Sequence, residues 1–140
     1  MTVNYFDYRA GLGNVGSYQA SAKPFLSSSI NVSSSGEVVR INFPNVTRFV
    51  TIKNVGSDDG GTDILMRVGF SENGTNGLSD NNFLLLSNQE SYSADWRVTS
   101  LYLKVDTTGS FNATASVIAG MTAIDAGELQ HNWTGSSGVG

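Results

Sequence analysis

The chain is short and carries few charges, which limits the classes of protein it can belong to. It has 140 residues, a formal net charge of −4 and only 14% charged residues, against about 25% in an average globular domain. The eight Lys and Arg residues are spread along the chain, whereas nucleic-acid binding needs clustered cations that neutralise phosphates. No apolar run approaches the length of a membrane span, which is roughly 18 residues or more. We therefore expect neither a nucleic-acid partner nor a membrane partner.

The chain also lacks the residues of most catalytic and metal centres. It has no Cys and a single His, His131, whereas a zinc centre usually takes several nitrogen or sulfur ligands. A Ser–His–Asp triad would need His131 as its base, and the Gly-x-Ser-x-Gly motif is absent. We therefore expect a protein that is not an enzyme, with no catalytic residue, no cofactor and no zinc site.

The first segment, residues 1–16, combines aromatic residues with glycines and has no clean period. It contains Tyr5, Phe6 and Tyr8, and we interpret it as an arm that either docks on a neighbouring subunit or stays unattached. Gly11-x-Gly13-x-x-Gly16 matches the dinucleotide-binding fingerprint. That motif works only when it opens a helix, and the residues that follow here, 17–21, are strand-like. We therefore interpret these glycines as part of an arm or turn.

Alternation of apolar and polar residues predicts short, half-buried strands along most of the chain. The clearest example is 91–98, in which every second residue from Tyr92 to Val98 is apolar. After this segment the pattern shifts by one residue, which predicts a bulge or tight turn near Thr99–Ser100. The strand candidates are 15–21, 28–33, 37–43, 48–54, 63–70, 82–87, 91–98, 100–106 and 111–120.

Aromatic residues on the strands are candidates for a sugar-binding platform, because ring faces stack on pyranose rings. The candidates are Tyr18, Tyr92, Trp96 and Tyr102. Tyr92 and Trp96 share the apolar face of their strand, so we assign them to the core. Tyr102 lies on the polar face of its strand and is the better candidate for an exposed ring.

Two loops rich in Gly, Asn and Asp contain most of the clustered carboxylates. One holds Asp58, Asp59 and Asp63, and the other, 72–82, holds Glu72 and Asp80. Oxygen-rich loops can bind calcium, but the spacing is not that of an EF-hand and turns favour the same residues. We interpret both loops as turns and assign no metal ligand, with calcium binding as the alternative.

Five Asn-x-Ser/Thr sequons occur in this Asn-, Ser- and Thr-rich chain. They begin at Asn31, Asn45, Asn73, Asn112 and Asn132, and we expect them to be unmodified.

Near the C-terminus, only 122–130 has a helical signal, with Thr122 and Asp125 at the spacing of a capping box. The tail beyond it is polar and glycine-rich and contains His131 and Trp133. Together with the strand candidates, this predicts an all-β fold: an antiparallel, jelly-roll-like β-sandwich of about eight strands. We predict one domain over 1–140, with an N-terminal arm (1–16), a core (17–120) and a C-terminal arm (121–140).

Several short stretches resemble small structural proteins of marine tailed phages and related aquatic viruses. They are Tyr8–Gln19 with Lys23–Pro24–Phe25, Phe43–Arg48, Val68–Ser71 and Gly135–Gly140. The resemblance covers most of the chain. It implies a coat or decoration role on the surface of the virus capsid.

A protein of that kind would bind the major capsid protein and copies of itself, as a trimer or another small oligomer. We expect the arms to make these contacts through Tyr5, Phe6, Tyr8, His131 and Trp133. The main alternative is a carbohydrate- or receptor-binding module of a tail fibre or of a secreted protein.

Overall fold

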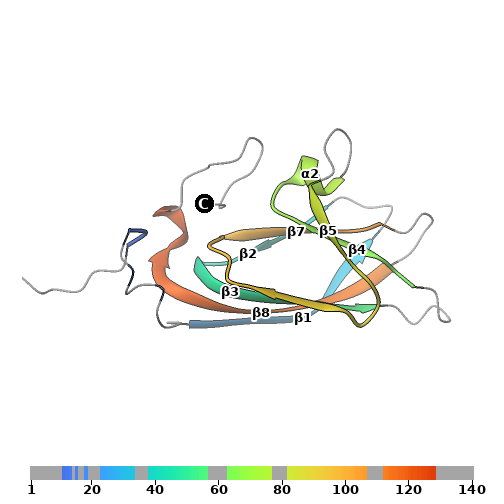
Figure 1. The fold of residues 1–140 in the computed structure, drawn as a ribbon, viewed down its shortest axis with the longest axis horizontal. Coiled ribbons are helices and arrows are strands. Elements are labelled where there is room, and N and C mark those ends of the chain that lie inside the picture. The colour runs from blue at the N-terminus through green and yellow to red at the C-terminus, as the bar shows by residue number, and fades with distance from the viewer. Residues whose placement is uncertain are drawn as a thin grey trace, which may run out of the picture.

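A computed structural model shows that the chain folds as two packed β-sheets. The structure describes residues 11–13, 15, 18, 23–33, 38–56, 63–76, 82–106 and 112–128. One sheet lies above the other in Figure 1, and a short helix lies on the outer side of the upper sheet. The prediction of an all-β sandwich is confirmed.

Eight strands and two short helical segments make up the described part of the chain. In order they are β1 (Lys23–Ser33), β2 (Val39–Asn42), β3 (Asn45–Gly56), β4 (Met66–Gly69), α2 (Glu72–Asn76), β5 (Phe83–Leu86), β6 (Ser91–Ala94), β7 (Ser100–Val105), β8 (Asn112–Asp125) and the 3-10 helix η1 (Ala126–Glu128).

The strands form two four-stranded antiparallel sheets, which we call sheet A and sheet B. Sheet A has the order β1-β8-β3-β6, and sheet B has the order β2-β7-β4-β5. Each strand of the first half of the chain pairs with one of the second half: β1 with β8, β2 with β7, β3 with β6 and β4 with β5. Long strands β3 and β8 lie side by side in the middle of sheet A.

Alternation places one face of each sheet in the core. In β8, Ala113, Ala115, Val117 and Ala119 are buried, whereas the residues between them point outward. They meet the inner face of sheet B, where Leu101, Leu103 and Val105 of β7 are also buried. The residues of the main core come from both sheets and include Val50, Ile52, Met66 and Val68. Burial of these apolar side chains is the main force that holds the sheets together.

Near Thr99–Ser100, where a bulge or tight turn was predicted, the chain instead passes from one sheet to the other, with a bend at Thr99. β6 ends in sheet A at Ala94, and β7 begins in sheet B at Ser100. The crossing is held by Thr47 of β3, whose amide donates a hydrogen bond to the Val98 carbonyl (3.0 Å). The Val98 amide in turn donates to Thr47 Oγ1 (3.1 Å). The shift in the alternation therefore records a change of sheet.

A buried asparagine joins the two sheets near the C-terminal end of β3, at the opposite end from Thr47. Asn54 is fully buried, and its Nδ2 donates to the carbonyls of Ile64 (2.6 Å) and Leu86 (3.0 Å). Its Oδ1 accepts a hydrogen bond from the Gly56 amide (2.9 Å). Leu86 belongs to β5 of sheet B, so this side chain ties the end of β3 to the opposite sheet.

The predicted strand at 15–21 is wrong where the structure describes it. Val15 lies in a turn, and Tyr18 is helical, with its amide donating to the Val15 carbonyl (3.0 Å). Leu12 and Tyr18 instead pack on Val46 and Ile124 at the end of sheet A. The first strand begins only at Lys23.

Two other segments differ from the sequence-based expectation. The predicted helix at 122–130 begins as strand, because β8 continues to Asp125, beyond the expected core boundary at residue 120. Thr122 Oγ1 donates to the Val46 carbonyl (2.7 Å), which holds this end of β8 against β3. Conversely, the loop predicted at 72–82 begins with α2, whose start is capped by Ser71: its Oγ accepts a hydrogen bond from the Gly74 amide (3.0 Å).

Candidate functional site

The residues that the sequence suggested for partner contacts are not among those that the structure describes. Tyr5, Phe6, Tyr8, His131 and Trp133 all lie outside the described ranges. The candidate sites below are therefore built from hollows and exposed surfaces of the sandwich itself.

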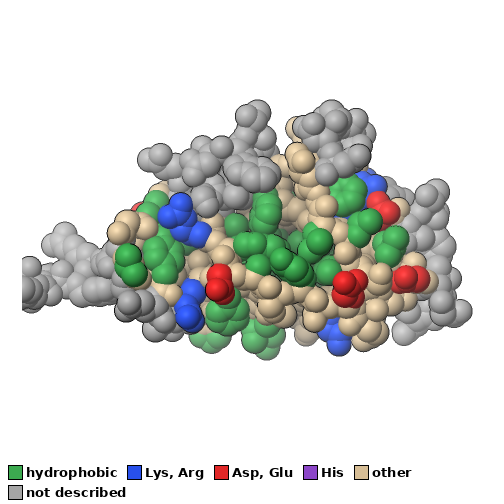
Figure 2. All heavy atoms as spheres, viewed as in Figure 1, with side chains coloured by type: hydrophobic (Ala, Val, Ile, Leu, Met, Phe, Trp, Pro, Cys, Tyr) green, Lys and Arg blue, Asp and Glu red, His purple; other side chains and the backbone are tan. Residues whose placement is uncertain are grey.

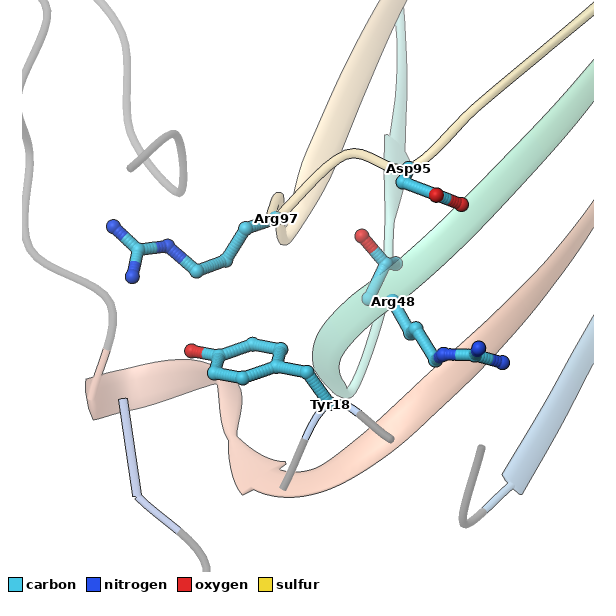
Figure 3. A pocket seen from close by; sticks show the side chains of 5 residues that line it. Tyr18, Arg48, Asp95 and Arg97 are labelled. Atoms are coloured by element: carbon cyan, nitrogen blue, oxygen red, sulfur yellow. The ribbon is translucent and has the colours of Figure 1, made fainter. Parts of the chain in front are cut away.

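The first candidate is an open hollow of about 420 Å³ at one end of sheet A. Tyr18, Thr47, Arg48, Asp95 and Arg97 line it. Figure 3 shows that the Arg97 side chain and the Tyr18 ring lie on one side, whereas Arg48 and Asp95 point toward the other. The two guanidinium groups thus diverge, and a bidentate anion site needs them to converge. This hollow has the charge but not the geometry of an anion-binding site.

The second candidate is an apolar hollow of about 310 Å³ between the two sheets, on the side where β5 and β6 form the sheet edges. We call it the aromatic groove; it is lined by Val68, Gly69, Phe70, Asn82, Phe83, Leu84 and Trp96. Phe70 and Trp96 pack edge-to-face, with ring centroids 5.0 Å apart, and Tyr92 stacks on Trp96 with centroids 5.6 Å apart. Hydrophobic side chains gather around a hollow in the middle of this face in Figure 2. A small pocket with mostly apolar walls is typical of sites that bind one ring or one apolar side chain.

The aromatic residues are exposed differently from the sequence-based assignment. Tyr102, the expected exposed ring, is buried, because α2 packs over this face of β7 and the Arg40 guanidinium lies 5.7 Å from the ring centroid. Tyr92, assigned to the core, is 43% exposed, because its strand lies at the edge of sheet A where the two sheets part. Trp96 is partly buried and packs against the core as expected.

The third hollow, of about 420 Å³, has polar side chains from Asn31, Gln89, Asn112 and Thr114 in its lining, together with Val55, Gly56 and Ala113. Two sequons meet there, because Asn31 pairs with Thr114 and Ser33 with Asn112 in the β1–β8 register. Asn31 and Asn112 are both exposed on the outer face of sheet A. Neutral amides and hydroxyls can bind hydroxyl groups, but no ring wall closes this hollow among its lining residues.

The acidic loops show no metal centre in the part that is described. No group of three or more His, Cys, Asp or Glu side chains comes together among the described residues. Asp63 Oδ1 accepts a hydrogen bond from the Asn88 amide (2.9 Å), the role of a turn residue. Asp58, Asp59 and Asp80 lie outside the described ranges.

An ion pair joins Arg67 of β4 to Asp106, with 2.6 Å between Nε and Oδ1. The same guanidinium donates to the Thr75 and Asn76 carbonyls at the end of α2 (3.1 and 3.0 Å) and lies over the Phe83 ring. Arg67 thus fixes α2 on sheet B, and this use of a cation is structural.

A fourth candidate is an apolar pair on the outer face of sheet A. Leu26 of β1 and Ile118 of β8 are direct partners in the strand register, and they are 73% and 44% exposed. Their neighbours across the sheet are Thr51 and Ser93, so the row carries no charge. Hydrophobic side chains protrude along the lower margin of Figure 2, where Figure 1 places β1 and β8. We call Leu26 and Ile118 the sheet-A pair.

The sequence held a signal for the sheet-A pair that the search for catalytic motifs did not use. Ile118 occupies a polar phase of the β8 alternation, where Thr114 and Ser116 precede it. Leu26 likewise follows the partly buried Phe25 and falls on the outward phase of β1. An apolar residue in an outward phase is a departure from the pattern that indicates a contact surface.

The last observations concern membrane-spanning helices and similarity to known proteins. Among the described residues, no helix is long and apolar enough to cross a membrane. No protein-family model matches the chain, and no curated protein matches it either.

Proposed function

We propose that this chain is a non-enzymatic structural protein of a virus particle, a coat or decoration subunit that binds the outer surface of the capsid. The observation that carries the proposal is the sheet-A pair. Leu26 and Ile118 expose apolar surface in an uncharged row on the outer face of sheet A, and another protein can cover this surface at little desolvation cost. The described hollows, in contrast, contain no cluster of acid, base and nucleophile.

The strand pairing supports the proposal, and we infer from it a jelly-roll topology. A jelly roll arises when a long antiparallel ribbon of four strand pairs folds over into two sheets. The pairs β1–β8, β2–β7, β3–β6 and β4–β5, distributed alternately between sheets A and B, match that description. Jelly rolls are common in viral capsid proteins, which is an argument by analogy of fold.

The partners that follow from the proposal are the major capsid protein and further copies of this chain. The sheet-A pair would face the capsid. The terminal segments, with Tyr5, Phe6 and Tyr8 at one end and His131 and Trp133 at the other, would add contacts to neighbouring subunits. A segment of this kind can bind by adding a strand to an exposed sheet edge.

The test uses one substitution in the sheet-A pair and one matched control. Ile118→Asp places a charge in the proposed contact, and Tyr92→Asp places the same charge on a side chain of almost equal exposure, 43% against 44%. Each full-length variant is mixed with capsids assembled from the major capsid protein of the same virus and sedimented. Ile118→Asp should lose at least about tenfold in affinity, which corresponds to about 1.4 kcal/mol, and Tyr92→Asp should co-sediment like the unmodified chain. Equal binding by all three proteins would contradict the proposal.

The aromatic groove favours a second candidate, the carbohydrate- or receptor-binding module. Tyr92 offers one ring face to solvent while the other stacks on Trp96, and Asn82 supplies an amide at the same hollow. Ring faces carry negative charge density that attracts the C–H groups of a sugar face. Under this alternative, Tyr92→Asp abolishes binding to glycans of the host surface, and Ile118→Asp leaves it unchanged. The two substitutions therefore separate the two functions.

A further inference from the structure

Strand β5 lies at the edge of sheet B but has the side chains of a central strand. It reads Phe83–Leu–Leu–Leu86, and no charged residue occurs anywhere from 81 to 89. Continuous apolar runs are typical of strands that are covered on both faces and paired on both sides. In the described part of the chain, β5 pairs on one side only, with β4.

Both faces of β5 expose leucine. Leu84 and Leu85 point to opposite sides of sheet B because successive strand residues alternate, and they are 38% and 42% exposed. Leu84 lines the aromatic groove, and Leu85 lies on the outer face opposite Arg67 in the strand register. One apolar residue on each face is what a strand needs when a further strand is to be added beside it.

The other three sheet edges carry the features by which proteins prevent such pairing. β1 begins with Lys23 and Pro24 and has a register shift near Ser29, a non-glycine residue with φ of 65°. β2 contains Arg40. β6 lies between the charged residues Glu90 and Asp95. Charges, prolines and bulges at an edge all oppose the addition of another strand, and β5 lacks each of them.

We propose that β5 pairs antiparallel with β5 of a second copy of this chain, joining the two B sheets into one continuous sheet around a two-fold axis. A two-fold contact brings the same surface of each copy together, and an antiparallel β5–β5 pair continues the antiparallel order of sheet B. Leu84 and Leu85 of each copy would then be covered by their counterparts.

The distribution of charge favours a second copy as the occupant. The chain has a net charge of −4, so two copies repel each other in general. The neutral stretch 81–89 is where that repulsion is weakest. Arg67, the nearest cation on β4, is already paired with Asp106 and lies over Phe83. The inference rests on the proposed function for its biological use, since a coat subunit must contact its neighbours, but its physical basis is β5 alone.

The test measures the association of full-length variants by sedimentation equilibrium. Leu85→Lys places a charge on the proposed contact, and Val55→Lys is the matched control, because Val55 has an exposure of 38% but lies on β3 in sheet A. We expect the unmodified chain and Val55→Lys to form dimers with the same dissociation constant. The Leu85→Lys dimer should dissociate at least about tenfold more readily. Thermal unfolding of each variant verifies that the fold is intact.

Hydrogen exchange adds a readout that is specific for strand pairing. In the dimer, the β5 amides that point away from β4 should exchange more slowly than in dilute monomer. The exchange rates of the β2 amides should not change. A chain that stays monomeric at all concentrations would overturn the inference, as would a Leu85→Lys dimer of unchanged affinity. Capsid binding distinguishes the two proposals: a monomeric Leu85→Lys variant that still co-sediments with capsids leaves the proposed function intact.

Discussion

Replacement of Asn54 by alanine tests how the two sheets are held together at the end of β3. The side chain is fully buried and satisfies three backbone groups: the carbonyls of Ile64 and Leu86 and the amide of Gly56. Alanine removes all three hydrogen bonds at once and leaves each group buried without a partner. The result should be a loss of stability that exceeds that of an ordinary surface substitution.

The expected magnitude follows from the number of groups left unpaired. Each buried, unsatisfied polar group costs about 1–3 kcal/mol, so three groups give a loss of at least about 3 kcal/mol in the free energy of unfolding. For a chain of this size that corresponds to a fall of about 10 °C in the melting temperature. Urea unfolding followed by circular dichroism measures the free energy directly. Asn31→Ala is the matched control, because it makes the same change at an exposed strand position.

A second substitution separates the hydrogen bonds from the loss of volume. Asn54→Asp keeps the size of the side chain and an oxygen for the Gly56 amide, but it turns an acceptor toward the carbonyls of Ile64 and Leu86. It should destabilise the protein at least as much as Asn54→Ala. The reasoning fails if Asn54→Ala and Asn31→Ala unfold within about 0.5 kcal/mol of each other, the usual spread of surface substitutions.

Two further predictions concern the packing of α2 on sheet B. Gly69→Ala should lower the free energy of unfolding by about 1–3 kcal/mol, because its Cβ would collide with Thr75 Oγ1. Gly127→Ala, with open space around it, should be neutral in the same urea titration. Arg67→Met keeps much of the side-chain volume but removes the ion pair with Asp106 and the donors to the end of α2. It should cost about 2 kcal/mol and speed hydrogen exchange in α2, and a variant with unchanged exchange would contradict the bracing role of Arg67.

The sequence predicted most of the fold because alternation is a direct consequence of strand geometry. In β8 every second residue from Ala113 to Ala119 is buried, as the pattern indicated. The shift near Thr99–Ser100 located the point where the chain changes sheet, although the sequence alone could not say that a second sheet was involved. Both are local signals, and at these two places local signals were enough.

Exposure was harder to predict, because it depends on where a strand lies within its sheet. Tyr92 occupies an inward phase but lies on an edge strand and is exposed, whereas Tyr102 occupies an outward phase but is covered by α2. Neither the edge position of β6 nor the presence of α2 is written in the period of the sequence. The short strand expected around Tyr18 failed for a related reason: Tyr18 packs with Leu12 on Val46 and Ile124 as a small cluster and not as part of a ladder.

The candidate surfaces also depend on where each strand lies within its sheet. The sheet-A pair required the β1–β8 register, since Leu26 and Ile118 are far apart in the sequence and become neighbours only in the sheet. The unusual character of β5 required the strand order, because an uncharged apolar run is unremarkable in the centre of a sheet and exceptional at its edge. In both cases the residues are visible in the sequence, but their place on an exposed face or at a sheet edge follows only from the strand order and register.

Electron cryomicroscopy of capsids saturated with the full-length protein tests the proposed function most directly. We expect ordered density for the sandwich on the outer capsid surface, with sheet A toward the capsid and Leu26 and Ile118 in the contact. Capsids without added density, or protein found only at the tips of tail fibres with sheet A facing solvent, would contradict it.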